Sequence, residues 1–356
     1  MGRRQWAVNS WCQACCCYRE TNSRPLPPAH CLLPSADCYT LLVDVSSLLF
    51  GHSKALYSTW IFYKPDHVLV DCGEGAATHL GNGGFAVERV LLTHGHIDHI
   101  SGLPSLLWSR AAGMGDTQKP LAIYHPRDDM FVADMQTYLE RTASRLPFAL
   151  RWISLEAGAS FELTKPASAD EPAQHAPRRG RRVVTFATQH VPGRLTLGYK
   201  IVETRQRLKP EYAALSQEQI RARARAEGRD GVRALMEEYE ATLVAVGGDG
   251  LPLDPATVQG CELLLHEATL LDAKERKHQW HSTLDEAVWV AAAVGPKALV
   301  LYHVSGRYQA GEIASAACRS AMHYGIRFPI WYLYRDRLSR CWKGAPDKRD
   351  EPKQKE

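Results

Sequence analysis

Four side chains that can bind a metal ion lie within one six-residue segment of the sequence. The segment His94–His99 reads HGHIDH and directly follows a short apolar run. Imidazole nitrogens suit zinc, and a neighbouring carboxylate can bind a second ion or hold a water molecule. Because positions 94, 96 and 99 cannot face one point on a regular helix, the spacing predicts a metal-binding loop. The alternative interpretation is a histidine-rich surface turn without metal.

A single loop cannot complete two metal sites, so further ligands must come from distant segments. Each of the three candidates follows an apolar segment typical of a strand: His190, Asp249 and His303. One polar residue at a strand end is commonly not a ligand, but the recurrence of the pattern favours a shared site. A layered α/β fold places its chemistry at the carboxyl ends of its strands, where all of these residues are expected.

The segments that would position these residues alternate between β and α patterns. Apolar and β-branched runs predict strands at 59–63, 67–70, 90–93, 121–124, 182–188, 196–202, 243–246, 262–265 and 298–302. Helical patterns cover 130–140, 203–240, 285–294 and 309–324, and a surface loop is predicted at 165–182. Each half of the chain has strands first and then helix. This order suits an α/β fold of two facing sheets with helices outside.

Composition narrows the class of protein. The 356 residues carry a formal net charge of +4 and are 45% hydrophobic, which is ordinary for a soluble globular protein and permits a polyanionic substrate without requiring one. No apolar run reaches the roughly 18 residues of a membrane span, and the N-terminus lacks the apolar stretch of a signal peptide. We therefore expect a cytoplasmic protein that does not bind membranes.

The two ends of the chain differ from its centre. Residues 1–38 lack apolar periodicity and include a Pro-rich stretch, so they are predicted to be a disordered lead-in, and 342–356 a polar tail. The folded domain would then span 39–341. The cysteines within 12–17 have no second CxxC pair at zinc-ribbon spacing, which favours a disordered lead-in over a metal site.

With these motifs, the chain resembles the metallo-β-lactamase superfamily and, within it, the ribonuclease Z family, the endonucleases that trim the 3′ ends of precursor tRNAs. The resemblance covers roughly residues 60–310. The general pattern HxHxDH is shared by the whole superfamily, whereas HEAT at 266–269 and HST at 281–283 are narrower and indicate ribonuclease Z. The resemblance implies a four-layer αββα sandwich of the metallo-β-lactamase type, with two facing mixed sheets and helices outside.

The family pattern also implies a role for each candidate residue. One Zn²⁺ would be held by His94, His96 and His190, a second by Asp98, His99 and His303, and Asp249 would bridge the two. Two metal ions can lower the pKa of a water molecule and clamp the attacking and leaving oxygens of a phosphodiester. The resemblance makes Asp98 the general base, His281 the general acid, and Glu267 the residue that fixes the tautomer of His281.

His281 has a second interpretation that needs no catalysis. Ser282 or Thr283 begins a predicted helix with acidic residues in its first turn, so His281 can be the neighbour of an N-cap. The two interpretations are compatible, because the start of a helix is a natural place for a phosphate.

The sequence departs from the family pattern in three places. The usual Gly-rich segment near the N-terminus is replaced by 49–54, and Gly250 follows Asp249 where threonine is common. Bacterial members often have a Gly/Pro- and Lys-rich arm that grips the tRNA elbow, and here a charge-balanced helical insertion at 203–240 stands in its place. Two groups of arginines either reach RNA phosphates or are simply solvated: Arg221, Arg223 and Arg225, and those within 178–182.

Three functions remain open. The complete ligand set, with Glu267 and His281, favours a zinc-dependent endoribonuclease that removes 3′ trailers from precursor tRNA. The altered arm favours a hydrolase of a small phosphodiester, ester or cyclic nucleotide. A non-catalytic RNA-binding relative would be expected to have lost ligands, and none is lost. The expected partner is therefore precursor tRNA or another phosphodiester, and the resemblance suggests a homodimer.

Overall fold

The computed structural model describes residues 44–113, 119–143, 145–163 and 180–344. The predicted lead-in at 1–38, the first residues of the predicted domain, most of the predicted loop at 165–182 and the tail from 345 lie outside the described residues. Within the described part, no helix combines the length and the apolar character that a membrane crossing requires.

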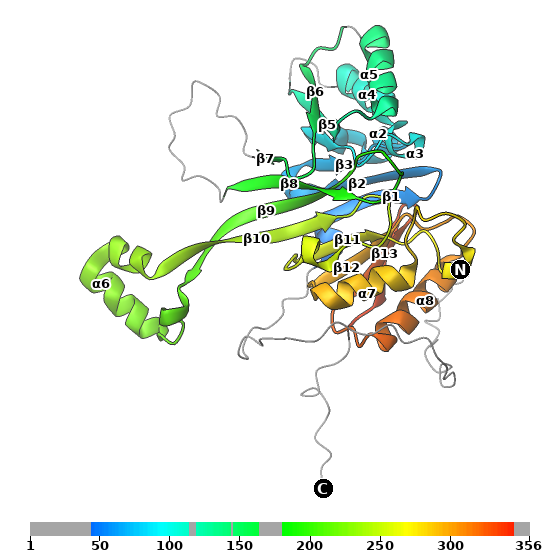
Figure 1. The fold of residues 1–356 in the computed structure, drawn as a ribbon. Coiled ribbons are helices and arrows are strands. Elements are labelled where there is room, and N and C mark those ends of the chain that lie inside the picture. Colours follow the sequence, from blue (N-terminus) through cyan, green and yellow to red (C-terminus); the bar gives the residue numbers. More distant parts are fainter. Residues whose placement is uncertain (1–43, 114–118, 144, 164–179, 345–356) are drawn as a thin grey trace, which may run out of the picture. The chain divides into compact units, whose positions relative to one another are not determined.

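The first sheet has six strands that lie side by side in sequence order (Figure 1). They are β1 (Leu49–Lys54), β2 (Ser58–Tyr63), β3 (Val68–Val70), β4 (Arg89–Leu91), β5 (Leu121–Pro126) and β6 (Leu150–Leu155). The pairs β1–β2 and β2–β3 are antiparallel, and the pairs from β3 to β6 are parallel. The helices of this half are α1 (Val45–Leu48), α2 (Ala76–Leu80), α3 (Ile97–Ile100), α4 (Leu103–Gly113) and α5 (Met130–Thr142), with 3-10 turns η1 (Lys64–Asp66) and η2 (Gly81–Ala86).

The second sheet has eight strands, again in sequence order. They are β7 (Ser160–Glu162), β8 (Arg181–Thr188), β9 (Thr196–Leu208), β10 (Met236–Val246), β11 (Leu263–Glu267), β12 (Ala298–Tyr302), β13 (Ile330–Tyr334) and β14 (Arg337–Trp342). The strands β10 to β13 pair parallel and the outer pairs are antiparallel. The helices are α6 (Gln217–Ala234), α7 (Leu284–Val294) and α8 (Ala310–His323), with 3-10 turns η3 (Pro210–Tyr212), η4 (Pro255–Val258) and η5 (Ala273–Glu275).

Three layers of buried side chains separate four layers of backbone. Successive side chains of a strand point to opposite faces, and β2 shows the result: Ile61 and Tyr63 pack between the two sheets, whereas Trp60 and Phe62 pack beneath α2 and α4. On the other sheet, α7 and α8 cover the outer face with a third core. The order helix, sheet, sheet, helix confirms the predicted four-layer sandwich with mixed sheets (Figure 1).

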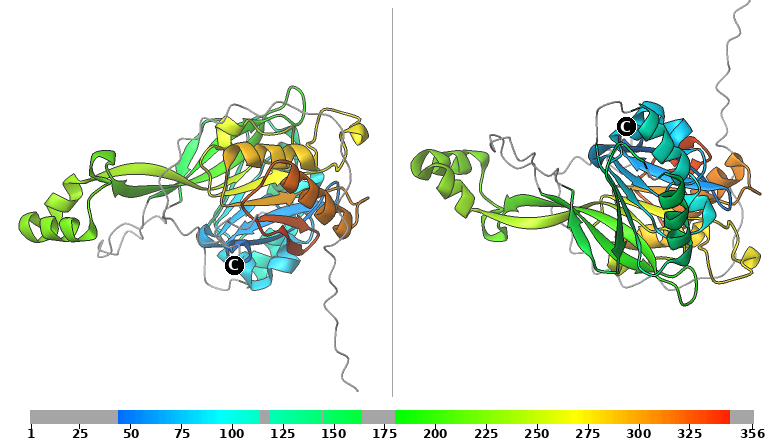
Figure 2. Two further views of the ribbon diagram at one scale, coloured as in Figure 1. Left: turned by 90° about the horizontal axis from the view of Figure 1, so that it is seen from below. Right: turned by 90° about the horizontal axis from the view of Figure 1, so that it is seen from above.

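The prediction of a helical insertion over 203–240 was wrong at both ends. Residues 203–208 and 236–240 belong to β9 and β10, which pair antiparallel along this stretch. The helical parts of the segment are the 3-10 turn η3 and α6, and α6 begins at a capping box in which the Ser216 hydroxyl accepts from Gln219 N. The charge-dense flanks are strands because opposite charges meet across the ladder, as in the pair Arg207 Nε–Glu237 Oε1 at 2.7 Å. Figure 2 shows the hairpin running away from the sheets with α6 at its far end.

Candidate metal centre

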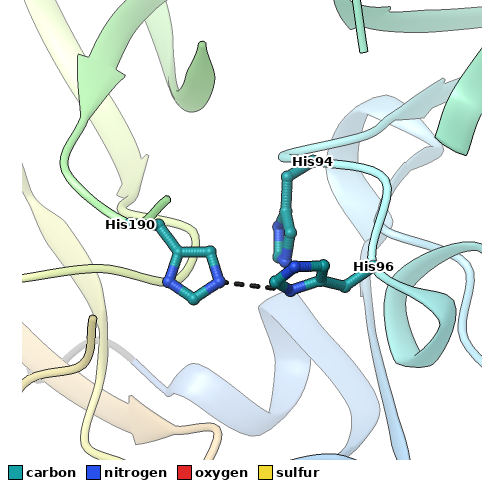
Figure 3. Close-up of side chains that lie close together, drawn as sticks. All are labelled: His94, His96 and His190. Carbon is teal, nitrogen blue, oxygen red and sulfur yellow. Dashed lines mark hydrogen bonds between the residues drawn. The ribbon is translucent and has the colours of Figure 1, made fainter. Parts of the chain in front are cut away.

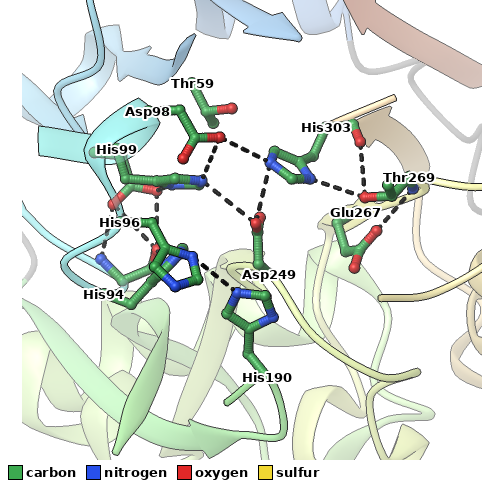
Figure 4. Close-up of polar contacts among 12 residues, drawn as sticks. Thr59, His94, His96, Asp98, His99, His190, Asp249, Glu267, Thr269 and His303 are labelled. Carbon is green, nitrogen blue, oxygen red and sulfur yellow. Dashed lines mark hydrogen bonds and ion pairs between the residues drawn. The ribbon is translucent and has the colours of Figure 1, made fainter. Parts of the chain in front are cut away.

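All seven predicted ligands lie together at one edge of the sandwich, beyond the carboxyl ends of strands (Figure 4). His94 and His96 follow β4, and Asp98 and His99 lie in α3. The other three follow β8, β10 and β12: His190, Asp249 and His303. The predicted metal-binding loop is thus a loop followed by one turn of helix, which turns Asp98 and His99 to the same side as the two preceding histidines.

One group of three imidazoles has its nitrogens close enough to bind a single ion. The ligand atoms of His94, His96 and His190 all lie within 4.8 Å of one another (Figure 3). His190 Nε2 is 3.2 Å from His96 Nδ1. This is the trio that the resemblance implies for the first metal.

A second group contains Asp98, His99 and His303, whose ligand atoms also lie within 4.8 Å of one another. The Asp98 Oδ2 atom is 3.4 Å from His303 Nε2 and 3.6 Å from His99 Nε2. Asp249 lies beside both groups, with Oδ2 at 3.0 Å from His303 Nε2 and 3.4 Å from His99 Nε2. Its carboxylate also lies within 4.8 Å of ligand nitrogens of His94 and His190.

Hydrogen bonds at the far nitrogen orient four of the imidazoles. His99 Nδ1 donates to Asp71 Oδ2 at 2.8 Å, and His190 Nδ1 donates to the Trp280 carbonyl at 2.8 Å. In a neutral ring with its proton on Nδ1, Nε2 keeps a free lone pair that a metal ion can accept. His94 Nδ1 and His303 Nδ1 contact the hydroxyls of Thr93 and Thr269 at 2.9 and 2.8 Å, respectively. Such partners are typical of metal-binding histidines.

The backbone at His303 is held in an uncommon conformation. Its φ is 55°, a left-handed value that few residues other than glycine adopt. The Oγ of Ser53, on β1 of the other sheet, accepts from His303 N at 2.7 Å, and the Thr269 hydroxyl donates to His303 O at 2.9 Å. These two contacts fix the imidazole at the meeting point of the two sheets.

The donor atoms that face the centre fit a divalent cation. Among the described residues, His94 Nε2, His99 Nε2 and Asp249 Oδ1 are buried and have no hydrogen-bond partner. A buried polar atom without a partner costs about 1–3 kcal/mol, and a metal ion would satisfy all three. Burial alone would lower the pKa of His99, but the carboxylates of Asp249 and Asp71 outweigh it and raise that pKa well above its usual value. The surroundings therefore favour positive charge.

Glu267, which is buried, and His281, which is partly exposed, form a pair next to this cluster. Glu267 Oε1 lies 3.0 Å from His281 Nδ1, and the carboxylate also accepts from the backbone nitrogens of Gly250, Thr269 and Ser282 at 3.1, 2.8 and 2.9 Å. Burial lowers the pKa of His281, but the hydrogen bond and charge of Glu267 outweigh burial and raise it to about 9. His281 is therefore protonated at neutral pH.

The structure places His281 both directly before a helix start and beside the candidate ligands. Thr283 is the N-cap of α7 and forms a capping box with Glu286, so His281 does precede a helix start. Its ring also lies between those of His190 and His303, with centroids 4.8 and 5.4 Å away. Its ligand-capable atoms lie within 4.8 Å of those of His190 and Asp249, which puts it closer to the cluster than an N-cap neighbour requires.

The residues that orient the candidate ligands were not assigned roles from the sequence. They are Asp71, Thr93, Thr269 and Trp280, together with Asp129, whose Oδ2 accepts from Gly95 N at 2.7 Å. Thr269 is the last residue of the HEAT motif, and Asp71 begins the sequence DCGEG at 71–75. The sequence signal available for Asp71 was an acidic residue directly after the predicted strand at 67–70.

The structure does not bring the arginine candidates to the metal cluster. Arg221, Arg223 and Arg225 lie exposed on α6, at the far end of the hairpin. Of the group within 178–182, Arg181 pairs with Asp66 and Glu203 and Arg182 pairs with Glu240; positions 178 and 179 lie outside the described residues. The described arginines of this second group already have acidic partners.

Comparison with known proteins first defines the class. Residues 66–210 match the model of the Beta-lactamase superfamily domain. The metallo-beta-lactamase fold protein YhfI from Bacillus subtilis superposes with a TM-score of 0.54 at 13% identity, over 82% of this chain and 98% of that one. Fold and site together define a metal-dependent hydrolase of the metallo-β-lactamase fold.

Curated relatives then define the family. Ribonuclease Z of Geobacillus kaustophilus is 30% identical over 283 residues, which cover 76% of this chain and 85% of that protein. Ribonuclease Z of Shouchella clausii is 31% identical over 287 residues, or 76% and 84% of the two chains. The chain belongs to the ribonuclease Z family, as its motifs indicated.

Proposed function

We propose that this chain is a metal-dependent endoribonuclease that removes 3′ trailers from precursor tRNA. The observation that carries the proposal is the Glu267–His281 pair, held at 3.0 Å beside a complete set of seven candidate ligands. The two curated relatives described above are both named ribonuclease Z, which supports this activity. A cytoplasmic location remains the expectation for such an enzyme.

Each candidate ligand keeps the role that the resemblance implies. His94, His96 and His190 would hold one Zn²⁺, Asp98, His99 and His303 the other, and Asp249 would bridge them. Two such ions supply Lewis acidity and lower the pKa of a water molecule to near neutrality. The buried nitrogens and oxygens without hydrogen-bond partners support this assignment.

Asp98 is suited to accept the proton of the attacking water. Burial raises the pKa of its carboxyl, but the hydrogen bond from His303 and the charge of His99 outweigh burial and lower it, so the group is ionised at neutral pH. Leu56 N donates to Asp98 Oδ2 at 3.0 Å and fixes the carboxylate. A positioned base of this kind typically contributes about 10²–10⁴-fold to the rate.

His281 would donate a proton to the leaving oxygen. It is protonated at neutral pH, and Glu267 holds its Nδ1 so that Nε2 can face a substrate. Glu267 itself is fixed by three backbone N–H groups and keeps its negative charge, which compensates the charge of the imidazolium.

The hairpin of β9 and β10, tipped by α6, would contact the RNA away from the reaction centre. Its exposed arginines can pair with phosphates, which are the main source of non-specific affinity for nucleic acids. The acidic side chains on α6, such as Glu218 and Glu227, favour the second candidate function, a hydrolase of small phosphodiesters. Arg223 Nε already lies 3.2 Å from Glu227 Oε2.

The two functions separate in one experiment. Zinc-loaded protein is incubated with a precursor tRNA carrying a 3′ trailer and, in parallel, with a chromogenic bis-aryl phosphodiester. We expect trailer removal with defined ends. Hydrolysis of the small diester without trimming of the tRNA would contradict the proposal and favour the second function. The Asp249→Ala variant is the control for contaminating nucleases, and light scattering tests the expected homodimer.

A further inference from the structure

Helix α5 forms part of a pocket that opens beside the metal-ligand cluster. The pocket has a volume of about 640 Å³, and its lining combines His96 and Asp98 with Phe131, Met135 and Tyr138 of α5. This volume lies within the roughly 300–1,000 Å³ typical of small-ligand sites. His281 is not part of the lining, so the pocket opens on the Asp98 side of the cluster.

The pocket leaves large apolar side chains in contact with solvent. Ile97 is 66% exposed, Tyr138 52% and Phe131 38%. Large apolar side chains that are exposed together beside a candidate reaction centre indicate a surface that is covered when substrate binds.

The charges around the pocket fit a nucleobase better than a phosphate. Apart from His96 and Asp98, the one acidic or basic side chain of the Asp, Glu, Lys, Arg or His type in the described lining is Asp134, and its carboxylate would repel a phosphate. A carboxylate can instead accept from the amino group or ring N–H of a base. A cation lies at the margin, because the exposed guanidinium of Arg194 is 4.7 Å from the ring centroid of Phe131.

A direct link fixes α5 to the metal-binding loop. Asp129 Oδ1 accepts from Phe131 N and Val132 N at 3.0 and 3.2 Å and so caps the helix, while Oδ2 accepts from Gly95 N at 2.7 Å. The pocket and the cluster therefore keep one relative position, which a subsite next to the cleaved bond requires.

We propose that this pocket binds the base of one unpaired nucleotide that flanks the cleaved phosphodiester, stacked against Phe131 and Tyr138. The inference rests on the proposed function and adds the subsite that holds the single-stranded substrate in line. Stacking on aromatic rings tolerates every base, because each has a π-face. The subsite would accordingly position trailers of varied sequence, and Arg194 would pair with the adjacent phosphate.

The first test compares two variants of one side chain. Tyr138→Leu keeps apolar volume but removes the ring, and we expect the ratio of kcat/KM for precursor tRNA to kcat/KM for the bis-aryl diester to fall about tenfold. Tyr138→Phe keeps the ring and should retain the wild-type ratio. The matched control is Trp108→Leu on α4, an aromatic side chain that is 53% exposed and lies outside the pocket lining.

The second test removes the base instead of the ring. Four precursor tRNAs are prepared, each with a single abasic residue at one of the two positions before or the two positions after the cleaved bond. Each substrate is given to wild type and to Tyr138→Leu. At the position whose base occupies the pocket, the abasic residue should lower kcat/KM about tenfold for wild type. It should cause no further decrease of kcat/KM for Tyr138→Leu. If the effects of the abasic residue and of Tyr138→Leu on kcat/KM were independent at all four positions, the inference would be overturned.

The remaining outcomes separate this inference from the proposed function. If wild type trims precursor tRNA and Tyr138→Leu trims it equally well, the subsite is wrong and the function stands. If wild type hydrolyses the diester but does not trim tRNA, the function itself fails. A change of oligomeric state in Tyr138→Leu, seen by light scattering, would assign the exposed face to contact between copies and would also overturn the inference.

Discussion

Asp71 accepts a 2.8 Å hydrogen bond from Nδ1 of His99, and both side chains are buried. The same carboxylate accepts from Thr93 N at 2.8 Å and from the Thr93 hydroxyl. One acidic side chain thus orients a candidate ligand and fixes the strand end from which the HGHIDH segment begins.

Replacing Asp71 by asparagine tests this relationship. Asparagine tolerates the left-handed backbone at this position, where φ is 56°, so the fold should survive. We expect metal affinity to fall about 10–100-fold because His99 loses its anionic partner. Titration with a chelating competitor measures the affinity. Unchanged affinity together with wild-type activity would show that Asp71 has only a structural role.

His281→Ala is expected to keep both metal ions and to lose about 10²–10⁴-fold in kcat for precursor tRNA, the usual contribution of a general acid. Elemental analysis of the purified variant gives the metal content, and single-turnover cleavage gives the rate. Loss of one ion would instead show that His281 is itself a ligand. Its distance of no more than 4.8 Å from the ligand atoms of His190 and Asp249 makes this comparison decisive.

The pH dependence of cleavage should have an alkaline limb set by His281. The pKa of this group is about 9, above its usual value, so the proton donor is present below that pH and is lost as the pH rises through it. Glu267→Gln removes the charge that raises the pKa, and the limb should move to lower pH. A profile of kcat/KM from pH 6 to about 10.5 measures the shift. A limb that stays in place would rule out His281 as the donor.

Gly95→Ala should disturb the metal-binding loop by direct collision. A Cβ at this position would meet Asp129 Oδ1 at 2.3 Å and Phe131 Cβ at 2.8 Å. We expect loss of at least tenfold in activity and a lower melting temperature, since overpacking typically costs about 1–3 kcal/mol. Gly83→Ala is the matched control, because a Cβ there meets nothing within 4 Å. Equal melting temperatures for the two variants would contradict the described packing.

Shortening the hairpin tests its contact with RNA. Leu208 and Met236 are paired across β9 and β10, so a two-residue Asn-Gly turn can replace 209–235 without breaking the ladder. We expect KM for precursor tRNA to rise about tenfold relative to KM for the bis-aryl diester, and the salt dependence of tRNA binding to become shallower. Equal salt slopes for the two proteins would assign α6 to a solvated structural role.

The candidate ligands could be predicted because residues with metal-binding side chains also stand at the ends of predicted strands. HGHIDH is a local cluster, and His190, Asp249 and His303 each follow an apolar strand of a layered fold, whose strand ends meet at one edge. Their orienting partners were harder to find. Asp71 is 28 residues from His99, and Thr269 is 34 residues from His303, so no local spacing marks either pair.

The strands that were not predicted from the sequence are mostly those with charged residues. The ends of the 203–240 segment carry arginine and glutamate at high density, which suits an exposed helix as well as a two-stranded ribbon with both faces in water. Strands β6, β7 and β14 are partly exposed and include charged residues, so no apolar run marks them. β13 has the apolar pattern of a buried strand, but it was not among the predicted segments.

The candidate ligands are divided between the two halves of the sandwich. Four come from the segment after β4 in the first sheet, and three follow strands of the second. Cations bound at this edge would link the two halves, in addition to the apolar core that already joins them. Neither half alone holds all seven candidate ligands, so a metal centre built from them would form only after both halves have folded and docked. Catalytic competence would therefore report on completed folding of both halves.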